Sequence, residues 1–214
     1  MLSGRSRVCS IRAVSSSGSA PRTPLRPSQT VRRRWPDVRW IEDQTSLLRD
    51  PSIDVIVTAA VSDQRSAIAV EALTNGKDVV TDKPGCVTLD QLDQIEKGVT
   101  QSGRFWSVTF SERFEVREQS RTVGTRRTDR ARRADPGTRP SEGDRAHIAG
   151  GEGRPDWFYD RDRTGGIITD MASHQIDQFL WFTGAKDAEV VSSTVANYTH
   201  PESPTMQDFG EVTG

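Results

Sequence analysis

The chain has 214 residues, which is enough for one sizeable domain or two small ones. Its formal net charge of −1 gives no general attraction to nucleic acid or to an anionic membrane surface, and no apolar run approaches the roughly 18 residues of a membrane-spanning helix. The two cysteines, Cys9 and Cys86, have a spacing typical of neither a metal site nor a disulfide framework. We therefore expect no metal and a cytoplasmic location.

Two segments lack the apolar periodicity of helices and strands. Residues 1–34 contain eight Arg, eight Ser and no acidic residue, and residues 117–151 are also rich in Arg. We predict that both are disordered, irregular or non-native, because they cannot bury enough apolar surface to offset the entropy lost on ordering. The first has the composition of a mitochondrial transit peptide. Both also have the composition that GC-rich DNA gives when it is translated out of frame. We therefore hypothesise two frame disturbances in the gene, which translation of the other two reading frames tests.

Ordered structure is predicted to begin near Trp35, with a short helix around residues 46–50 that Pro51 ends. The pattern that follows consists of a buried strand at 53–58, a helix at 63–75, a strand at 78–81, a helix from Thr88 to Gly103 and a strand at 105–110. Strands that alternate with helices in this way indicate parallel pairing through right-handed crossovers. We expect a Thr88–Gln91 capping box at the start of the second long helix.

The tetrapeptide Thr81-Asp82-Lys83-Pro84 stands at the carboxyl end of the second strand. Ligands of open parallel sheets bind beyond the carboxyl ends of the strands. A lysine there can present its ammonium group to a reacting hydroxyl, while the proline fixes the direction of the chain. The alternative is an ordinary solvated lysine in a loop.

A helix is predicted between the glycine pair Gly165-Gly166 and Gly184. Four residues at i, i+4, i+7 and i+11 share one face of it: Asp170, His174, Asp177 and Trp181. A carboxylate one turn before an imidazole can orient the ring and raise its basicity, as a general base for an alcohol requires. The alternative is a helix whose polar face merely carries Asp and His.

The last part of the chain has strand character at residues 189–198 and again shortly before Gly214. A domain that begins near residue 154 has only about 60 residues, which is few for a complete mixed sheet with its own core. We therefore predict a truncated C-terminal domain.

These motifs together resemble the glucose–fructose oxidoreductase / inositol dehydrogenase (Gfo/Idh/MocA) family. The similarity lies in a strand that ends in an acidic-Lys-Pro tripeptide (Asp82-Lys83-Pro84, where Glu is usual), in the pair Arg113-Phe114 after a later strand, and in the Gly-Gly…Asp-x-x-x-His-x-x-Asp helix. It covers about residues 35–116 and 152–212.

The resemblance implies an α/β fold, with an incomplete Rossmann-like parallel sheet followed by a truncated α+β substrate domain. It divides the chain into a partial dinucleotide-binding domain at 35–116 and a substrate and catalytic domain at 152–214, with the Arg-rich segments 1–34 and 117–151 outside them. It also implies an oxidoreductase that uses NAD or NADP and acts on a sugar, polyol or related hydroxy compound. A homo-oligomer is expected only where the C-terminal sheet is complete.

The resemblance assigns roles to individual residues. Lys83 would polarise the reacting C–OH or C=O group, His174 would exchange the hydroxyl proton, and Asp170 would orient His174 and the substrate. The cofactor would lie against five residues at the ends of the first two strands, namely Thr58, Ala59, Ala60, Asp82 and Pro84.

The sequence departs from the family pattern before Trp35, where Gly4 and Gly18 are the only glycines and no G-x-G-x-x-G turn occurs. Such a turn supplies the backbone amides and the helix N-terminus that hold the pyrophosphate. The alternative function is therefore a non-catalytic remnant that binds no dinucleotide. Nucleic-acid binding by the Arg-rich segments is disfavoured, because they have neither interleaved aromatic residues nor a basic helical face.

Overall fold

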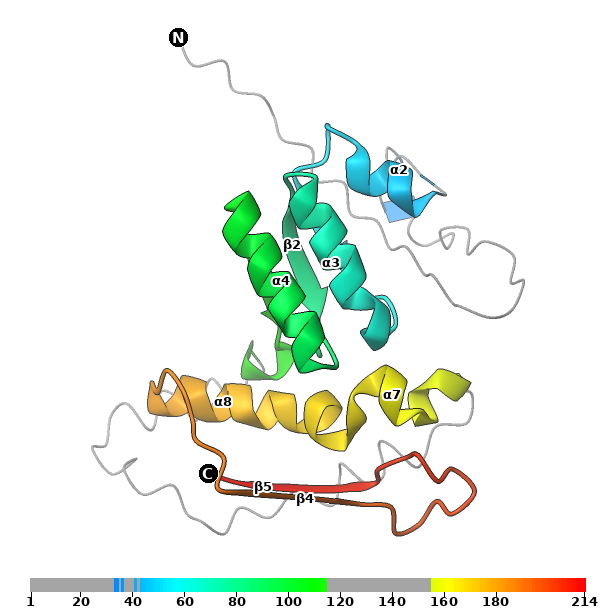
Figure 1. Cartoon of the computed structure of the whole chain (residues 1–214), viewed down its shortest axis with the longest axis vertical. Coiled ribbons are helices and arrows are strands. Elements are labelled where there is room, and N and C mark those ends of the chain that lie inside the picture. The colour runs from blue at the N-terminus through cyan, green and yellow to red at the C-terminus, as the bar shows by residue number, and fades with distance from the viewer. Residues whose placement is uncertain (1–32, 35, 37–40, 42, 115–154) are drawn as a thin grey trace.

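The computed structural model describes residues 33–34, 36, 41, 43–114 and 155–214. The predictions for residues 1–32 and 117–151 lie outside these residues. Figure 1 shows two parts, an upper one built on a parallel sheet and a lower one with a long helix above a pair of strands.

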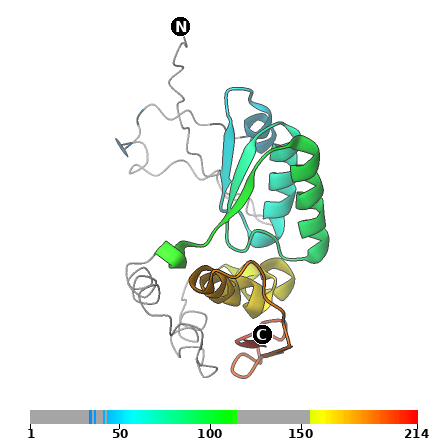
Figure 2. The ribbon, with the colours of Figure 1, turned by 90° about the vertical axis from the view of Figure 1, so that its left-hand side faces the viewer.

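The first part is a three-stranded parallel sheet in the order β1-β2-β3. Its strands are β1 (Val55–Thr58), β2 (Asp78–Asp82) and β3 (Trp106–Thr109), and Val80 of β2 pairs with Val57 on one side and Ser107 on the other. The crossover helices α3 (Arg65–Thr74) and α4 (Leu89–Ser102) lie side by side on one face of the sheet (Figure 2). The predicted β-α-β-α-β unit is confirmed.

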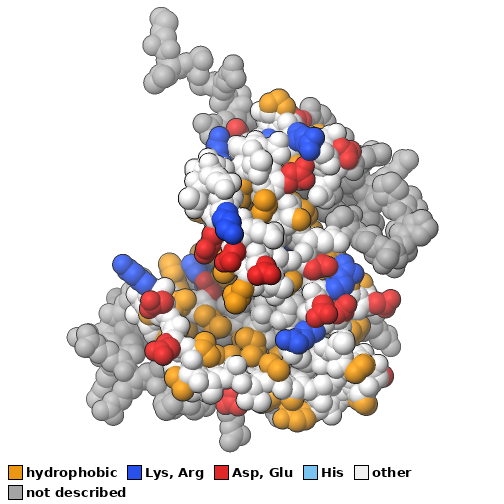
Figure 3. All heavy atoms as spheres, viewed as in Figure 1, with side chains coloured by type: hydrophobic (Ala, Val, Ile, Leu, Met, Phe, Trp, Pro, Cys, Tyr) orange, Lys and Arg blue, Asp and Glu red, His pale blue; other side chains and the backbone are white. Residues whose placement is uncertain are grey.

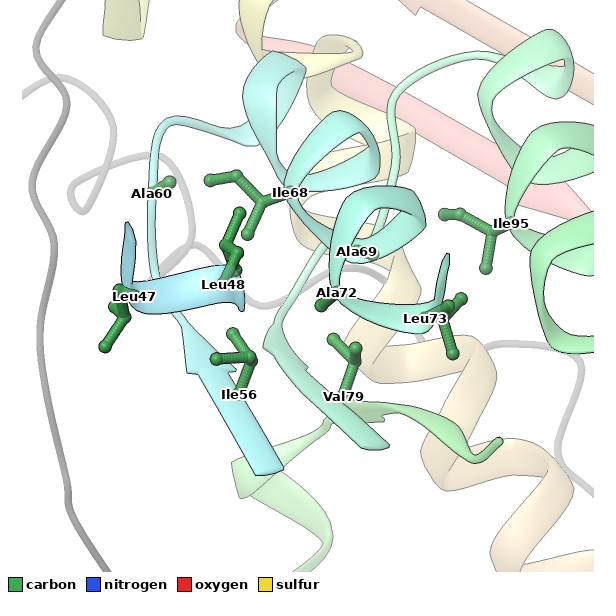
Figure 4. Packing of buried hydrophobic residues seen from close by; sticks show 10 residues of the cluster. All are labelled: Leu47, Leu48, Ile56, Ala60, Ile68, Ala69, Ala72, Leu73, Val79 and Ile95. Atoms are coloured by element: carbon green, nitrogen blue, oxygen red, sulfur yellow. The ribbon is translucent and has the colours of Figure 1, made fainter. Parts of the chain in front are cut away.

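The core of this part lies between α3, α4 and the sheet, with the short helix α2 (Gln44–Arg49) against it. Figure 4 shows the ten buried apolar side chains that form it: Leu47, Leu48, Ile56, Ala60, Ile68, Ala69, Ala72, Leu73, Val79 and Ile95. The two small residues Ala69 and Ala72 are completely buried, as are the larger Leu73 and Val79. Small side chains on the inner face let a helix lie close to the sheet, and the large ones then fill the remaining space.

The ends of α4 show how local sequence sets its limits. Thr88 accepts a hydrogen bond from the Gln91 amide through its side chain, as predicted, but the Gln91 side chain accepts from Val87 instead of completing the reciprocal pair with Thr88. Gly103 ends the helix in the left-handed region, with φ 63°. That conformation is open to glycine because it has no Cβ.

The second part begins with two short turns, η3 (Asp156–Tyr159) and α7 (Arg161–Thr164), followed by the π-helical turn η4 (Ile168–Ala172) and the helix α8 (Ser173–Thr183). The predicted strand over 189–198 is shorter in the structure. It is β4 (Ser192–Ala196), paired in antiparallel fashion with β5 (Phe209–Thr213). In the described part of the chain, each helix is too short or too polar to cross a bilayer.

Candidate active site

Lys83 follows directly after β2 and reaches from the parallel sheet into the second part. Its Nζ donates hydrogen bonds to the main-chain oxygen of Asp170, at 2.7 Å, and to the Asp170 carboxylate oxygen Oδ1, at 3.0 Å. Both side chains are largely enclosed, with 19% and 18% of their surface exposed. An ion pair with so little access to water is screened less than a surface pair, so it holds the ammonium in a defined direction.

The glycine pair before η4 fixes where Asp170 lies. Gly165 and Gly166 have φ 84° and 79°, and the next residue, Ile167, donates its amide to the Gln207 side chain at 3.1 Å. A Cβ at Gly166 would lie 2.3 Å from Oε1 of Gln207. This entry into the helix therefore favours glycine for its conformation, and a side chain at position 166 would displace Gln207 from the Ile167 amide.

His174 lies in the first turn of α8 and is buried, with 6% of its surface exposed. Its Nε2 lies 3.7 Å from Oε1 of Glu112, and its ring meets Phe110 edge to face with ring centres 6.0 Å apart. Its Nδ1 is buried and has no hydrogen-bond partner among the described residues. Burial lowers the pKa of His174 and the charge of Lys83 adds to that shift, while the carboxylates of Glu112, Asp170 and Asp177 oppose it. The ring is therefore neutral near pH 7 and has a nitrogen free to accept a proton.

A second ion pair ties α8 to the segment that follows β3. Arg113, in the turn η2 (Ser111–Phe114), holds the buried carboxylate of Asp177 with two of its nitrogens, one of them Nε at 2.8 Å from Oδ2. The same guanidinium lies over the ring of Trp181, 4.8 Å from its centre. A planar fork on a carboxylate, stacked on an aromatic ring, is an arrangement that arginine forms and lysine does not.

The four residues predicted to share a helix face all meet the first part of the chain. Asp170 binds Lys83, His174 lies against η2, and Asp177 and Trp181 both contact Arg113. The pairing within that face differs from the expected one. The charge of Asp170 does raise the pKa of His174, as expected, but the described hydrogen bond of its carboxylate goes to Lys83. The carboxylate within 4 Å of the imidazole is that of Glu112.

The five residues expected to contact a cofactor lie at the carboxyl edge of β1 and β2. Ala59 and Asp82 are exposed there, while the other three are buried: Thr58 ends β1, and Ala60 and Pro84 lie in the loops that follow β1 and β2. The Thr58 hydroxyl accepts a hydrogen bond from the Ala60 amide at 3.3 Å. The Lys83–Pro84 peptide is cis.

Sequence reasoning missed three residues of this site: Phe110, Glu112 and the buried Arg65. Phe110 and Glu112 follow β3 and so lie at the same sheet edge as Lys83, which is a signal that the order of parallel strands already contains. Arg65 gave no such signal, because an arginine near the start of a helix is ordinarily solvated.

Charged side chains of both signs gather on the face shown in Figure 3, where the two parts meet. One ion pair across this junction joins Arg163 of α7 to Asp63 of the turn η1 (Ser62–Gln64), with Nε 3.1 Å from Oδ2. Within the described residues, no group of three or more His, Cys, Asp or Glu side chains is arranged to hold a metal ion.

Comparison with known proteins matches most of the chain to the two domain models of one protein family. Residues 8–110 match the model of an oxidoreductase family with an NAD-binding Rossmann fold, GFO_IDH_MocA, and residues 120–213 match the model of the GFO/IDH/MocA C-terminal domain. Both matches reach into the Arg-rich segments, beyond the ranges over which the sequence motifs carried the resemblance.

Individual relatives agree with these matches. The chain is 24% identical over 186 residues to the scyllo-inositol 2-dehydrogenase (NAD(+)) of Bacillus subtilis (strain 168), which covers 81% of this chain and 47% of that protein. It is 28% identical over 139 residues to the D-xylose dehydrogenase of Paenarthrobacter nicotinovorans, covering 63% of this chain and 35% of that protein.

A solved structure of an oxidoreductase from Erwinia carotovora atroseptica SCRI1043 superposes with a TM-score of 0.69 at 34% identity, covering 86% of this chain and 54% of that one. The chain thus spans about half the length of this structure and of the inositol dehydrogenase. With both domain models matched in their family order, the chain belongs to the Gfo/Idh/MocA family of oxidoreductases.

Proposed function

We propose that Lys83, Asp170 and His174 form the catalytic centre of a dehydrogenase that oxidises a secondary alcohol of a sugar or polyol, or reduces the corresponding ketone. The observation that carries the proposal is the pair of hydrogen bonds from the Lys83 ammonium to Asp170, one turn before the buried ring of His174. An ammonium and a neutral imidazole gathered in one region can polarise a hydroxyl group and take its proton. The relatives named for scyllo-inositol and D-xylose support a polyhydroxy substrate.

In the oxidation direction, the Lys83 ammonium donates a hydrogen bond to the substrate oxygen and stabilises the negative charge that develops there. His174 accepts the hydroxyl proton at a ring nitrogen, while the C–H bond breaks with its electron pair and the C=O bond forms. Asp170 holds the Lys83 ammonium in place through its main-chain and carboxylate oxygens. A bound nicotinamide supplies the hydride acceptor for the oxidation and the hydride donor for the reverse reaction.

The residues present fit the nicotinamide end of a dinucleotide. Ala59 and Asp82 are exposed at the carboxyl edge of the parallel sheet, where ligands of such sheets bind, and the small side chain of Ala59 would suit the approach of a flat ring. Asp82 would line the ribose side, and the buried Thr58, Ala60 and Pro84 would shape the loops beneath it. The sequence supplies no G-x-G-x-x-G turn for the pyrophosphate.

Two measurements test the proposal on the full chain. The first is a titration with NADH and with NADPH, followed by the fluorescence of the tryptophans. The ring of Trp106 lies near Gly85, after the Lys83 loop, and that of Trp181 lies against Arg113. Saturable quenching supports the dehydrogenase, and no binding at about millimolar nucleotide contradicts it. The second is turnover of a panel of polyols and aldoses.

Single substitutions then assign the roles. Lys83→Ala and His174→Ala should each lower turnover by a factor of about 100 or more while nucleotide binding changes little, because each removes a group that acts on the reacting oxygen. Lys186→Ala is the matched control for Lys83, since Lys186 is an exposed lysine beyond α8. Retained activity in either of the first two variants would refute the assignment.

A further inference from the structure

Arg65 is an arginine enclosed in the interior beneath the Lys83 loop. It opens α3, and only 6% of its surface is exposed. Its Nη1 donates to three consecutive main-chain oxygens, those of Asp82 at 3.0 Å, Lys83 at 2.5 Å and Pro84 at 2.9 Å. Its Nε donates to the main-chain oxygen of Ala60 at 2.7 Å. One side chain therefore holds both loops at the carboxyl edge of the sheet.

The arrangement requires a cation with several donors. Three carbonyl oxygens directed at one point repel one another, and each loses the hydrogen bonds that water would supply. The two N–H groups of Nη1 are shared among these three oxygens, while Nε of the same rigid plane reaches the Ala60 oxygen in the other loop. An ammonium group is a single point of charge and cannot bridge the two loops in this way. Burial lowers the pKa of Arg65 and the charge of Asp82 opposes this, so the cost of enclosing the cation is partly offset.

We propose that Arg65 is a positioning residue that fixes the main chain of residues 82–84 and thereby directs the Lys83 side chain to Asp170. With the three carbonyl oxygens turned toward Arg65, the Lys83 side chain leaves the loop toward the second part of the chain. Through its hydrogen bond to the Ala60 oxygen, the same guanidinium fixes the position of the loop after β1 relative to the Lys83 loop. Its effect on catalysis rests on the proposed function, while its effect on Lys83 does not.

Competitive acetylation measures the position of Lys83 without cofactor or turnover. The full chain has four lysines, so a limiting amount of acetic anhydride followed by peptide mass spectrometry gives the reactivity of each one. Lys97 is exposed on α4 and serves as the reference. Lys77 is buried, with its ammonium bound to the main-chain oxygens of Asp50 and Ile53, and reports any loosening of the domain as a whole.

In Arg65→Met the reactivity of Lys83 relative to Lys97 should rise about fivefold, because the freed loop no longer holds the amine against Asp170. Lys77 should stay protected. Arg49→Met is the matched control, since Arg49 is an exposed arginine of the same part whose partner is Glu71, and it should change neither lysine. An unchanged Lys83 in folded Arg65→Met overturns the proposal, and so does a joint rise of Lys83 and Lys77, which marks a role in overall stability alone.

Arg65→Lys keeps the positive charge and removes the planar guanidinium. If Arg65→Met does not fold, this variant decides whether Arg65 positions Lys83. Its Lys83 should be about twice as reactive as in the wild type, with Lys77 unchanged, and an unaltered ratio overturns the proposal. If the chain turns over substrate, Arg65→Lys should lower kcat more than it raises KM. Inactivity of the wild type would contradict the proposed function and leave the labelling result decisive for Arg65.

Discussion

The carboxylate oxygen Oε1 of Glu112 lies 3.7 Å from Nε2 of His174, across the junction between the parallel sheet and α8. The imidazole thus faces a negative charge from a segment 62 positions earlier in the chain, while Lys83, bound to Asp170, acts on it with the opposite sign. Since burial depresses the basicity of the ring and Glu112 restores part of it, the protonation of His174 depends on tertiary contacts.

The first prediction concerns this pair. Glu112→Gln removes the largest of the three carboxylate charges that oppose the effect of burial, so the pKa of His174 should fall further below its ordinary value. NMR titration of the histidine ring protons measures it, and His174→Gln identifies the resonance among the three histidines of the chain. Glu71→Gln, which removes a carboxylate from α3, is the control and should leave the titration unchanged. A His174 pKa unaffected by Glu112→Gln would contradict the geometry.

The second prediction concerns stability and pH. Burial holds the pKa of His174 below 6.5, its value in an unfolded chain, so between the folded pKa and 6.5 the unfolded chain binds more protons. The free energy of unfolding should therefore fall as the pH is lowered through this window, and the contribution should be complete above it. Urea denaturation at about pH 7.5 and about pH 5.5 measures the loss, which should be smaller in His174→Gln. An equal loss in both proteins would show that His174 is not the group responsible.

The third prediction is that the two partners of the Arg113–Asp177 ion pair differ in how much stability is lost when each is replaced. Arg113→Met leaves a buried carboxylate without its partner and should cost about 3 kcal/mol. Asp177→Asn leaves a cation that is one quarter exposed and still stacked on Trp181, so it should cost only about 1 kcal/mol. Chemical denaturation of both single variants and of the double variant measures the two costs and their coupling. Equal costs would indicate that Asp177 is solvated in solution.

The fourth prediction concerns the loop that carries Lys83. A Cβ at Gly85 would lie 2.6 Å from the side chains of both Trp106 and Val108, so Gly85→Ala should cost about 2 kcal/mol and displace the loop. Gly103→Ala is the control, because its Cβ would meet nothing within 4 Å and only the positive φ opposes it, at about 1 kcal/mol. Thermal unfolding of both variants gives the comparison. A smaller loss for Gly85→Ala than for Gly103→Ala would contradict the packing.

Local signals made much of the first part predictable. The β-branched run of β1 and the amphipathic pattern of α4 identified these elements, and Gly103 marked where the helix ends. The helix predicted at 63–75 starts two residues earlier than α3 in the structure. A 3-10 turn at Ser62–Gln64 precedes α3, and nothing in the apolar pattern distinguishes the turn from the helix.

The sequence by itself determined that Lys83 follows a strand of a β-α-β unit and that Asp170 precedes His174 by about one turn in the helical segment after the glycine pair, because apolar patterns and residue spacing are local properties of the chain. Only the tertiary structure decided their partners: Lys83 with Asp170, Glu112 with His174, and Arg65 beneath the Lys83 loop. Periodicity specifies the direction of a side chain from its own element but contains no information on which distant group lies there. The strength of a charge contact depends on the separation and burial that packing sets.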